Sequence, residues 1–410
     1  MSTAVVLSYP THGHITPAMG VVSELVKRGE NVIFYATNRS RAKIQNSGAE
    51  FRAYGRDHDH FSPTPPTDGL FSDMARLIAL TEDMLPDLLD RVANDAPDYV
   101  LVDTKSLWGR LTAQILGIPA ITMSVVFAIQ PKLVPVPALV NGLYGGSSND
   151  RLFTGLEGLG RYFEPARRMT QRYGTRSPGI VGYLGNPHPL NIIFTSREFQ
   201  LEGDRFGEDY KFVGPCIAAD RDAADDFPFE QLNGAPLLYI SLGTTFNDAP
   251  EFYRSCFEAF ADAPWQIVLS AGAGDFACLQ AAPENFIVRR YVPQLELLRR
   301  ADAFVTHGGM NSANEGLYHS VPLIVVPQRG DQHLVAARVS ALGAGVSIQP
   351  AAVTPQKLRE AATNILCTPE YRERAAKIGD SLLRAGGHAR AAEEIIFHKR
   401  NLCGQFLREG

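Results

Sequence analysis

"AVVLSYPTHGHITPAMGVVSELVKRGENVIFYAT", residues 4–37, predicts a strand, a helix and a second strand in succession. The opening apolar run ends at Pro10, as expected of a buried strand. The next apolar residues recur at the spacing of one helix face: Ala18, Val21, Val22, Leu25 and Val26. Thr16 is predicted as the N-cap of this helix and Pro17 as its first residue, and Gly29 follows its end. A strand–helix–strand unit implies a parallel sheet.

The same alternation continues along the rest of the chain. Further strands are predicted at 97–103, 118–124, 190–196, 210–215, 236–245, 265–272, 285–292, 302–309 and 321–328. Residues 216–234 are acidic and poor in apolar side chains, which is typical of a linker. Because 410 residues are more than one core usually supports, we expect two doubly wound α/β domains, at 1–215 and 235–390, and a final helix at 391–410.

Ligands of such folds bind outside the carboxyl ends of the strands. "THGHITP" (11–17) and "THGGMNS" (306–312) each follow a predicted strand, one in each domain. We therefore expect these two segments to face each other across a cleft.

Composition excludes several classes of protein. The formal net charge is −5 and the basic residues are scattered, so no surface for nucleic acid is expected. The five cysteines form no C-x-x-C pair, which argues against a disulfide framework or a zinc site and for a reducing compartment. Residues 123–146 are apolar but hold Lys132 and three prolines, which disfavour a membrane span. With no basic segment typical of a signal peptide at the N-terminus, we expect a soluble cytoplasmic protein of open oligomeric state.

The strongest functional signal is "THGGMNSANEGLYHSVPLIVVPQRGDQ" (306–332). A predicted strand ends in this stretch, two glycines follow, and a helix has Asn311 in its first turn. The glycines let a ligand approach the backbone, and the N–H groups of a helix start attract an anion such as a diphosphate. Glu315, one turn further on, can accept hydrogen bonds from two sugar hydroxyls. Asp331 and Gln332 begin the next predicted helix, at the same edge of the sheet.

Several motifs resemble those of the UDP-glycosyltransferase superfamily, whose members have the GT-B fold. The matching segments are "GHITP" (13–17), "SLGT" (241–244), "YVPQLELL" (291–298), "HGGMNS" (307–312) with Glu315, and "PQRGDQ" (327–332). The chain is most similar to the bacterial macrolide-type members of the family 1 glycosyltransferases. The resemblance implies two Rossmann-like domains facing a cleft, with acceptor binding in 1–215 and nucleotide-sugar binding in 235–390. It also implies that the helix at 391–410 packs back on the first domain.

The same resemblance implies a role for each residue of the second-half site. The ring of Tyr291 stacks on the base of the donor, the backbone of Val292 and the side chain of Gln294 hold that base, and Glu315 binds the ribose. Thr244, His307, Gly309, Asn311 and Ser312 surround the diphosphate, and Asp331 and Gln332 hold the transferred sugar. Family members usually have Trp at the position of Tyr291, so the donor is left open between a UDP-sugar and a thymidine diphosphate (dTDP) sugar.

The N-terminal motif poses a choice between His12 and His14 as a general base. In the resembled family the histidine of the GH-x-x-P motif has this role, which corresponds to His14, and His12 is expected to be structural. A neutral imidazole suits removal of a proton from a hydroxyl near pH 7. Asp103 ends a predicted strand of the same domain, where a carboxylate would fix the tautomer of His14. Capping of the following helix is the alternative role of Asp103.

The implied protein is an inverting glycosyltransferase with no covalent intermediate, no cofactor beyond its nucleotide-sugar co-substrate and no obligatory metal. It would move a sugar, in the first place glucose, to a hydroxyl of an apolar small molecule such as a macrolide, a polyketide or a phenol. A hydrophobic acceptor pocket is expected near residues 123–146, with Phe61, Phe71, Met74, Trp108 and Phe127. The alternatives are a deoxysugar transferase of antibiotic biosynthesis that uses a dTDP donor, and a non-catalytic nucleotide-sugar-binding partner.

Two further motifs favour other chemistry only weakly. Asp57, His58, Asp59 and His60 form a D-x-D pattern with metal-ligating side chains, but we expect a solvated loop there. "GAGDFA" (272–277) fits a dinucleotide fingerprint. The segment that follows it is too short for the crossover helix of an NAD-binding unit, so no NAD site is expected.

Overall fold

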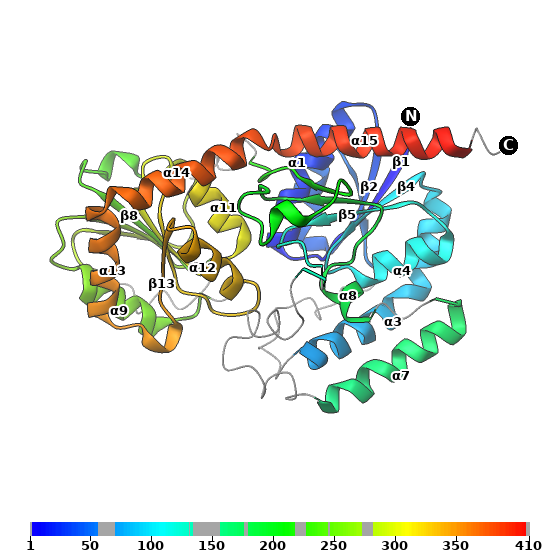
Figure 1. Cartoon of the computed structure of the whole chain (residues 1–410), viewed down its shortest axis with the longest axis horizontal. Helices are drawn as coiled ribbons and strands as arrows, with labels where there is room; N and C mark the ends of the chain where they lie inside the picture. Colours follow the sequence, from blue (N-terminus) through cyan, green and yellow to red (C-terminus); the bar gives the residue numbers. More distant parts are fainter. Residues whose placement is uncertain are drawn as a thin grey trace. The chain divides into compact units, whose positions relative to one another are not determined.

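The computed structural model describes residues 2–55, 70–130, 132–133, 156–175, 179–217, 227–244, 247–272 and 282–406. The chain divides into two compact units (Figure 1). Unit 1 is Met1–Cys216 together with Ala385–Gly410, and unit 2 is Ile217–Arg384. The chain therefore passes between the units twice.

Unit 1 is built on a parallel sheet with the strand order β3-β2-β1-β4-β5-β6-β7. Its strands are β1 (Thr3–Leu7), β2 (Asn31–Ala36), β3 (Glu50–Ala53), β4 (Tyr99–Asp103), β5 (Ala120–Ser124), β6 (Leu190–Ile193) and β7 (Tyr210–Phe212). The strand order reverses between β1 and β4, where Leu7 pairs with Val102. Ligands of doubly wound sheets bind at the carboxyl ends of the strands that flank such a reversal.

Helices of unit 1 pack on this sheet and on one another. They are α1 (His12–Lys27), α2 (Arg41–Asn46), α3 (Leu70–Asp95), α4 (Leu107–Leu116), α7 (Leu156–Tyr173), α8 (Gly179–Leu184) and α15 (Gly387–Phe406), with short 3₁₀ helices at Asn38–Ser40 and Gly203–Arg205. Helix α3 packs against both α4 and α7.

The start of α1 differs from the prediction. The helix begins at His12, with Thr11 as its N-cap in an extended conformation. Thr16 and Pro17 therefore lie inside the helix, so their predicted roles as N-cap and first helical residue are wrong. Pro17 is the sixth residue of the helix, so it removes the backbone hydrogen bond that an N–H at this position would donate to the Gly13 carbonyl, and the residue is buried. As a result His14 lies in the first turn of α1 rather than in a loop.

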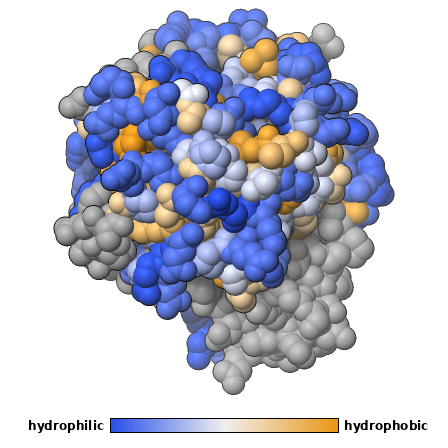
Figure 2. Space-filling model, turned by 90° about the vertical axis from the view of Figure 1, so that its left-hand side faces the viewer, coloured by the Kyte–Doolittle hydropathy of each residue, from blue (hydrophilic) through white to orange (hydrophobic). Residues whose placement is uncertain are grey.

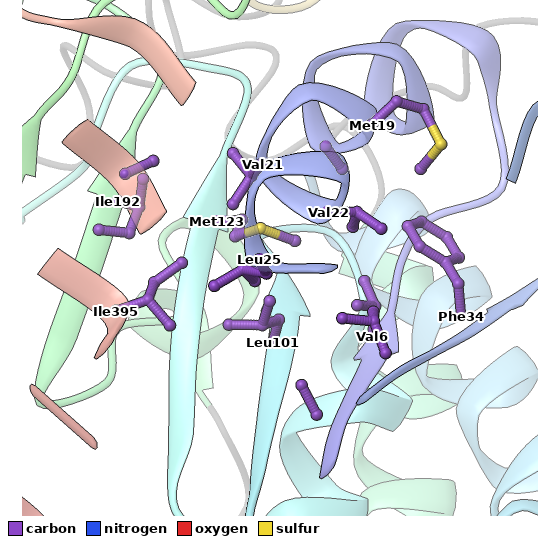
Figure 3. Packing of buried hydrophobic residues seen from close by; sticks show 14 of the residues in the cluster. Val6, Met19, Val21, Val22, Leu25, Phe34, Leu101, Met123, Ile192 and Ile395 are labelled. Atoms are coloured by element: carbon purple, nitrogen blue, oxygen red, sulfur yellow. The ribbon is translucent and has the colours of Figure 1, made fainter. Parts of the chain in front are cut away.

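The apolar stripe of α1 packs on the sheet as predicted. Val21, Val22 and Leu25 are fully buried, whereas Val26 is only partly buried. Leu25 belongs to one cluster with Leu101 of β4, which Figure 3 shows together with residues of β1, β2, β5 and α15. One hydrophobic core therefore joins the beginning and the end of the chain.

Replacement of Leu25 by alanine tests this packing. Because the side chain is fully buried, Leu25→Ala is expected to lower the free energy of unfolding by about 2–5 kcal/mol, through lost burial and the cavity left behind. The measurement is urea denaturation followed by circular dichroism. Lys27→Ala on the exposed face of the same helix should stay within about 0.5 kcal/mol of the wild type. Equal stability of the two variants would contradict the packing.

Unit 2 repeats the plan, with the strand order β10-β9-β8-β11-β12-β13, all parallel. Its strands are β8 (Leu237–Ser241), β9 (Gln266–Ser270), β10 (Phe286–Arg289), β11 (Ala303–Thr306), β12 (Leu323–Val325) and β13 (Gly345–Ser347). Its helices are α9 (Pro250–Phe260), α10 (Gln294–Leu298), α11 (Met310–Tyr318), α12 (Gln332–Ala341), α13 (Pro355–Cys367) and α14 (Pro369–Arg384), with 3₁₀ helices at Phe229–Gln231 and Pro350–Ala352. The order reverses between β8 and β11. Two doubly wound α/β sheets confirm the predicted fold class.

The C-terminal helix α15 packs with unit 1. Ala391 and Ile395 are fully buried in the core of that unit. Lys399 Nζ lies 2.5 Å from Glu30 Oε1, which ties the second half of the helix to the start of β2. Unit 2 ends at Arg384, whereas the sequence placed the end of the second domain at residue 390.

Among the described residues, no helix is long and apolar enough to cross a membrane. Figure 2 shows one face of the molecule, which is mostly hydrophilic and carries hydrophobic residues in small separate areas. Scattered apolar residues of this kind are ordinary on a protein surface.

Candidate active site

The structure brings His14 and Asp103 together at the strand-order reversal of unit 1. His14 follows β1 and Asp103 is the last residue of the neighbouring strand β4. The Nδ1 atom of His14 lies 2.8 Å from Asp103 Oδ2 and 3.0 Å from Oδ1. Because an ionised carboxylate can only accept, Nδ1 carries the proton and Nε2 is the basic nitrogen of the neutral ring.

Asp103 does not cap the following helix. Ser106 is the N-cap of α4, and its Oγ accepts a hydrogen bond from Gly109 N at 3.3 Å. Asp103 is 2% exposed, and its Oδ1 also accepts from Lys105 N at 2.7 Å. The carboxylate is therefore held by the turn that follows β4 and directed at His14.

Asn186 supports this turn from a distant part of the sequence, which the sequence analysis missed. It is fully buried in a left-handed conformation with φ 41°, and its Nδ2 donates to the carbonyl oxygen of Asp103 at 3.1 Å. Thr122 Oγ1 donates to the Asn186 carbonyl oxygen at 2.6 Å, which anchors Asn186 to β5. The signal available in the sequence was the residue type, since asparagine tolerates positive φ and favours turns, and Asn186 shortly precedes a predicted strand.

Several aromatic side chains hold the segment between β1 and His14. Tyr54 donates to the Ser8 carbonyl oxygen at 2.9 Å, and Trp108 Nε1 donates to Tyr54 Oη at 3.2 Å. The ring of Tyr9 lies 5.4 Å from that of His14. The loop between β1 and α1 is thus fixed from the side of β3 and α4.

The predicted acceptor pocket is only partly described. Trp108, Phe127 and Met74 are at most 2% exposed, so these three side chains are core residues and not pocket lining. Phe71 is partly exposed. Phe61 and most of the segment 123–146 lie outside the described residues.

In unit 2 the start of α11 forms the centre of the second site. β11 ends at Thr306, and Gly308 follows with φ 80°, where a Cβ atom would meet Val325 Cγ1 at 2.5 Å. Gly309 is the N-cap and has no side chain to satisfy the first backbone N–H groups of the helix. Asn311 and Ser312, in the first turn, are partly exposed. Such a helix start suits an anion.

His307 is packed between glycines. A Cβ atom on Gly243 would lie 2.6 Å from its Cε1 atom, and one on Gly309 would lie 2.4 Å from its Nε2 atom. The Nδ1 atom of His307 is buried without a hydrogen-bond partner. Burial lowers the pKa of His307 to about 4, so the ring is neutral near pH 7.

Buried neutral histidines predict a pH dependence of stability. Burial lowers the pKa of both His307 and His188 to about 4, with a smaller contribution from Arg110 at His188. Because their unfolded pKa is about 6.5, the unfolded state binds more protons below that pH. The free energy of unfolding should therefore fall as the pH is lowered from 6.5 toward 4. His307→Gln and His188→Gln should each flatten this fall in urea denaturation, whereas Lys27→Ala should keep it. An unchanged slope in both glutamine variants would contradict the assignment.

Glu315 is held on α11 by a chain of side chains. It is 5% exposed, and Gln294 Nε2 donates to its Oε2 at 2.6 Å. Tyr239 donates in turn to Gln294 Oε1 at 3.0 Å. Val292 is buried, while the neighbouring residue Tyr291 is 59% exposed.

The remaining predicted residues follow β8 and β12 at the same edge of the sheet, on a loop or at the start of a helix. Asp331 is the N-cap of α12 and is partly exposed. Gln332 is buried, and its Oε1 accepts from the backbone N–H of Gln328 at 2.8 Å and of Arg329 at 3.1 Å, so it also shapes the preceding loop. Thr244 is exposed after β8. The structure therefore places all the second-half residues after strands of one sheet, namely β8, β10, β11 and β12, of which β10 is separated from β8 by β9.

Within the described residues no group of three or more His, Cys, Asp or Glu side chains is arranged to hold a metal ion. The Asp57–His60 pattern lies outside those residues. So does the "GAGDFA" stretch after Gly272, which leaves the predicted absence of an NAD site untested there.

Comparisons with known proteins agree with this architecture. Residues 255–395 match the erythromycin biosynthesis protein CIII-like family in its C-terminal domain. The uncharacterized UDP-glucosyltransferase YojK of Bacillus subtilis is 35% identical, with 97% of each chain covered. The oleandomycin glycosyltransferase of Streptomyces antibioticus is 31% identical over 95% of this chain and 89% of that protein.

Solved structures show the same relationship. The glycosyltransferase of kitacinnamycin superposes with a TM-score of 0.80 at 31% identity, over 96% of this chain and 98% of that chain. CalG4, the calicheamicin glycosyltransferase, superposes with a TM-score of 0.79 at 27% identity. The superposition covers 98% of this chain and 99% of that chain. Two doubly wound units of this kind are the GT-B fold of these glycosyltransferases. The chain belongs to the family 1 glycosyltransferases of the macrolide and natural-product type, and it is a sugar-transferring enzyme.

Proposed function

We propose that the protein transfers glucose from UDP-glucose to a hydroxyl of an apolar natural product, with inversion at the sugar. The observation that carries this proposal is the contact of His14 Nδ1 with both carboxylate oxygens of Asp103. It leaves Nε2 of a neutral imidazole to act as the base. The UDP-glucosyltransferase name of the Bacillus subtilis relative supports glucose as the sugar.

In the proposed reaction His14 Nε2 removes the proton of the acceptor hydroxyl as its oxygen attacks the anomeric carbon. The new bond from oxygen to carbon forms on the face opposite the diphosphate, and the bond from carbon to the diphosphate oxygen breaks. The buried carboxylate of Asp103 stabilises the imidazolium that results. The electron pair leaves with UDP, and no covalent intermediate is required.

On the donor side, the start of α11 is proposed to bind the diphosphate, with Thr244, His307, Gly309, Asn311 and Ser312. Its N–H groups and dipole stabilise the charge that develops on the leaving group, so we propose that no metal is obligatory. Glu315 binds the ribose, and Tyr291, Val292 and Gln294 bind the base. Asp331 and Gln332 bind the glucose.

A dTDP-linked deoxysugar is the second candidate donor. It is supported by the exposed ring of Tyr291, which offers less stacking surface than Trp and so constrains the base less. It is also supported by the demethyllactenocin mycarosyltransferase of Streptomyces fradiae, which is 31% identical over 94% of this chain.

A thermal-shift series with UDP, dTDP and NAD at equal concentration tests the donor. A ligand at about 100 times its dissociation constant stabilises the folded state by about 2.7 kcal/mol, a rise of several degrees in melting temperature. We expect this rise with UDP. A rise with dTDP alone would favour deoxysugar transfer. A rise with NAD alone would contradict the proposal, and formation of a glucoside from UDP-glucose and a phenolic acceptor would complete the test.

A further inference from the structure

We propose that Tyr239 is a positioning residue of the donor site, which acts through Gln294 to hold the Glu315 carboxylate for the ribose hydroxyls. This inference rests on the proposed function, in which Glu315 binds the ribose. It assigns Gln294 a task toward Glu315 as well as toward the base. It also makes the buried phenol of Tyr239 a determinant of the affinity for the ribose of the nucleotide.

The phenol of Tyr239 is itself firmly held. The residue lies in the middle of β8 and is 1% exposed. Its ring stacks on Phe304 of the adjacent strand β11, with centroids 4.7 Å apart and planes inclined by 10°. A side chain packed in this way has little freedom to move its hydroxyl, so the hydroxyl gives a fixed point for its partner.

The donors and acceptors in the two hydrogen bonds that link Tyr239, Gln294 and Glu315 follow from the chemistry of these side chains. The Glu315 carboxylate only accepts, so the nitrogen of the Gln294 amide must face it, at 2.6 Å. The amide oxygen then faces Tyr239, whose hydroxyl must donate to it at 3.0 Å. Both bonds therefore point toward the carboxylate, and aligned bonds of this kind strengthen each other.

The consequence is a carboxylate fixed before the ligand arrives. A Glu side chain has several rotatable bonds, and ordering it on binding would cost affinity. Glu315 is 5% exposed, and the Gln294 bond at Oε2 fixes which way its carboxylate turns. Removal of the Tyr239 hydroxyl would let the amide of Gln294 turn over and place its oxygen against the carboxylate.

The experiment compares Tyr239→Phe with the wild type by calorimetric titration of UDP and of 2′,3′-dideoxy-UDP, which lacks the ribose hydroxyls. We expect the variant to bind UDP about 3–10-fold more weakly, the effect of one hydrogen bond. Its affinity for dideoxy-UDP should be unchanged, because that ligand has no hydroxyl for Glu315. In turnover, the KM for the donor should rise with little change in kcat.

Tyr99→Phe is the matched control. Tyr99 is a fully buried strand residue of unit 1. Its hydroxyl also donates a hydrogen bond to a side chain, that of Glu30, at 3.0 Å. This variant should bind both nucleotides as the wild type does. Equal UDP affinity of Tyr239→Phe and the wild type would overturn the inference. So would an equal loss for UDP and dideoxy-UDP, since it would indicate a general disturbance of unit 2. A wild-type protein that binds no UDP would instead refute the proposed donor.

Discussion

Replacement of His14 by alanine is expected to lower kcat by about 10²- to 10⁴-fold, the usual contribution of a positioned general base. The affinity for UDP should not change, because in the proposed reaction His14 acts on the acceptor hydroxyl, and the residues proposed to bind UDP belong to unit 2. Steady-state kinetics with a phenolic acceptor and a UDP thermal shift measure the two quantities separately.

His12→Ala is the control for this prediction. His12 is exposed in the same first turn of α1 and should tolerate the change with little loss of kcat. Asp103→Asn should lower kcat by about 10²-fold or more, because an amide can favour the wrong tautomer of His14. If His14→Ala retains wild-type kcat while His12→Ala loses it, the two histidines have been assigned in the wrong order.

Replacement of Glu315 by alanine is expected to weaken UDP binding by about 10- to 100-fold. A hydrogen bond to a charged group contributes about 1.5–3 kcal/mol, and a buried carboxylate is little screened by solvent. Titration calorimetry with UDP measures the loss directly. In thermal shift the variant should show little response at the UDP concentration that stabilises the wild type.

Glu296→Ala serves as the matched control in unit 2. Glu296 lies on α10, where it forms an ion pair with Arg299 in which both side chains are substantially exposed. A surface pair of this kind contributes little, so UDP binding should be preserved. Wild-type affinity in Glu315→Ala would show that the ribose is bound elsewhere.

Much of the architecture could be predicted because its signals are local. Buried strands such as β1 and β8 appear as short apolar runs, and the face of α1 repeats every three or four residues. The position of Asp103 at the end of β4 also followed from the sequence. By contrast, β3 has four residues with one buried side chain, Phe51, which is too little for a periodic pattern.

The residues that escaped prediction act over long sequence separations. Asn186 is 83 residues from the carbonyl of Asp103 that it binds, and Tyr239 is 55 residues from Gln294. Neither residue belongs to a recognisable sequence motif. In the sequence, a buried Tyr in an apolar strand cannot be distinguished from any other core residue. The start of α1 was missed for another reason: Pro17 resembles a first helical residue, but the extended Thr11 provides the cap one turn earlier.

The return of α15 to unit 1 has a consequence for how the protein is made on the ribosome. Ala391 and Ile395 complete the core of unit 1, yet they are translated after all of unit 2. Unit 2 has its whole sequence available as soon as Arg384 has emerged, whereas unit 1 must wait for the last helix even though its strands are synthesised first. The nascent chain therefore carries an unfinished N-terminal unit with an uncovered apolar surface, which is the form most open to aggregation and to chaperones.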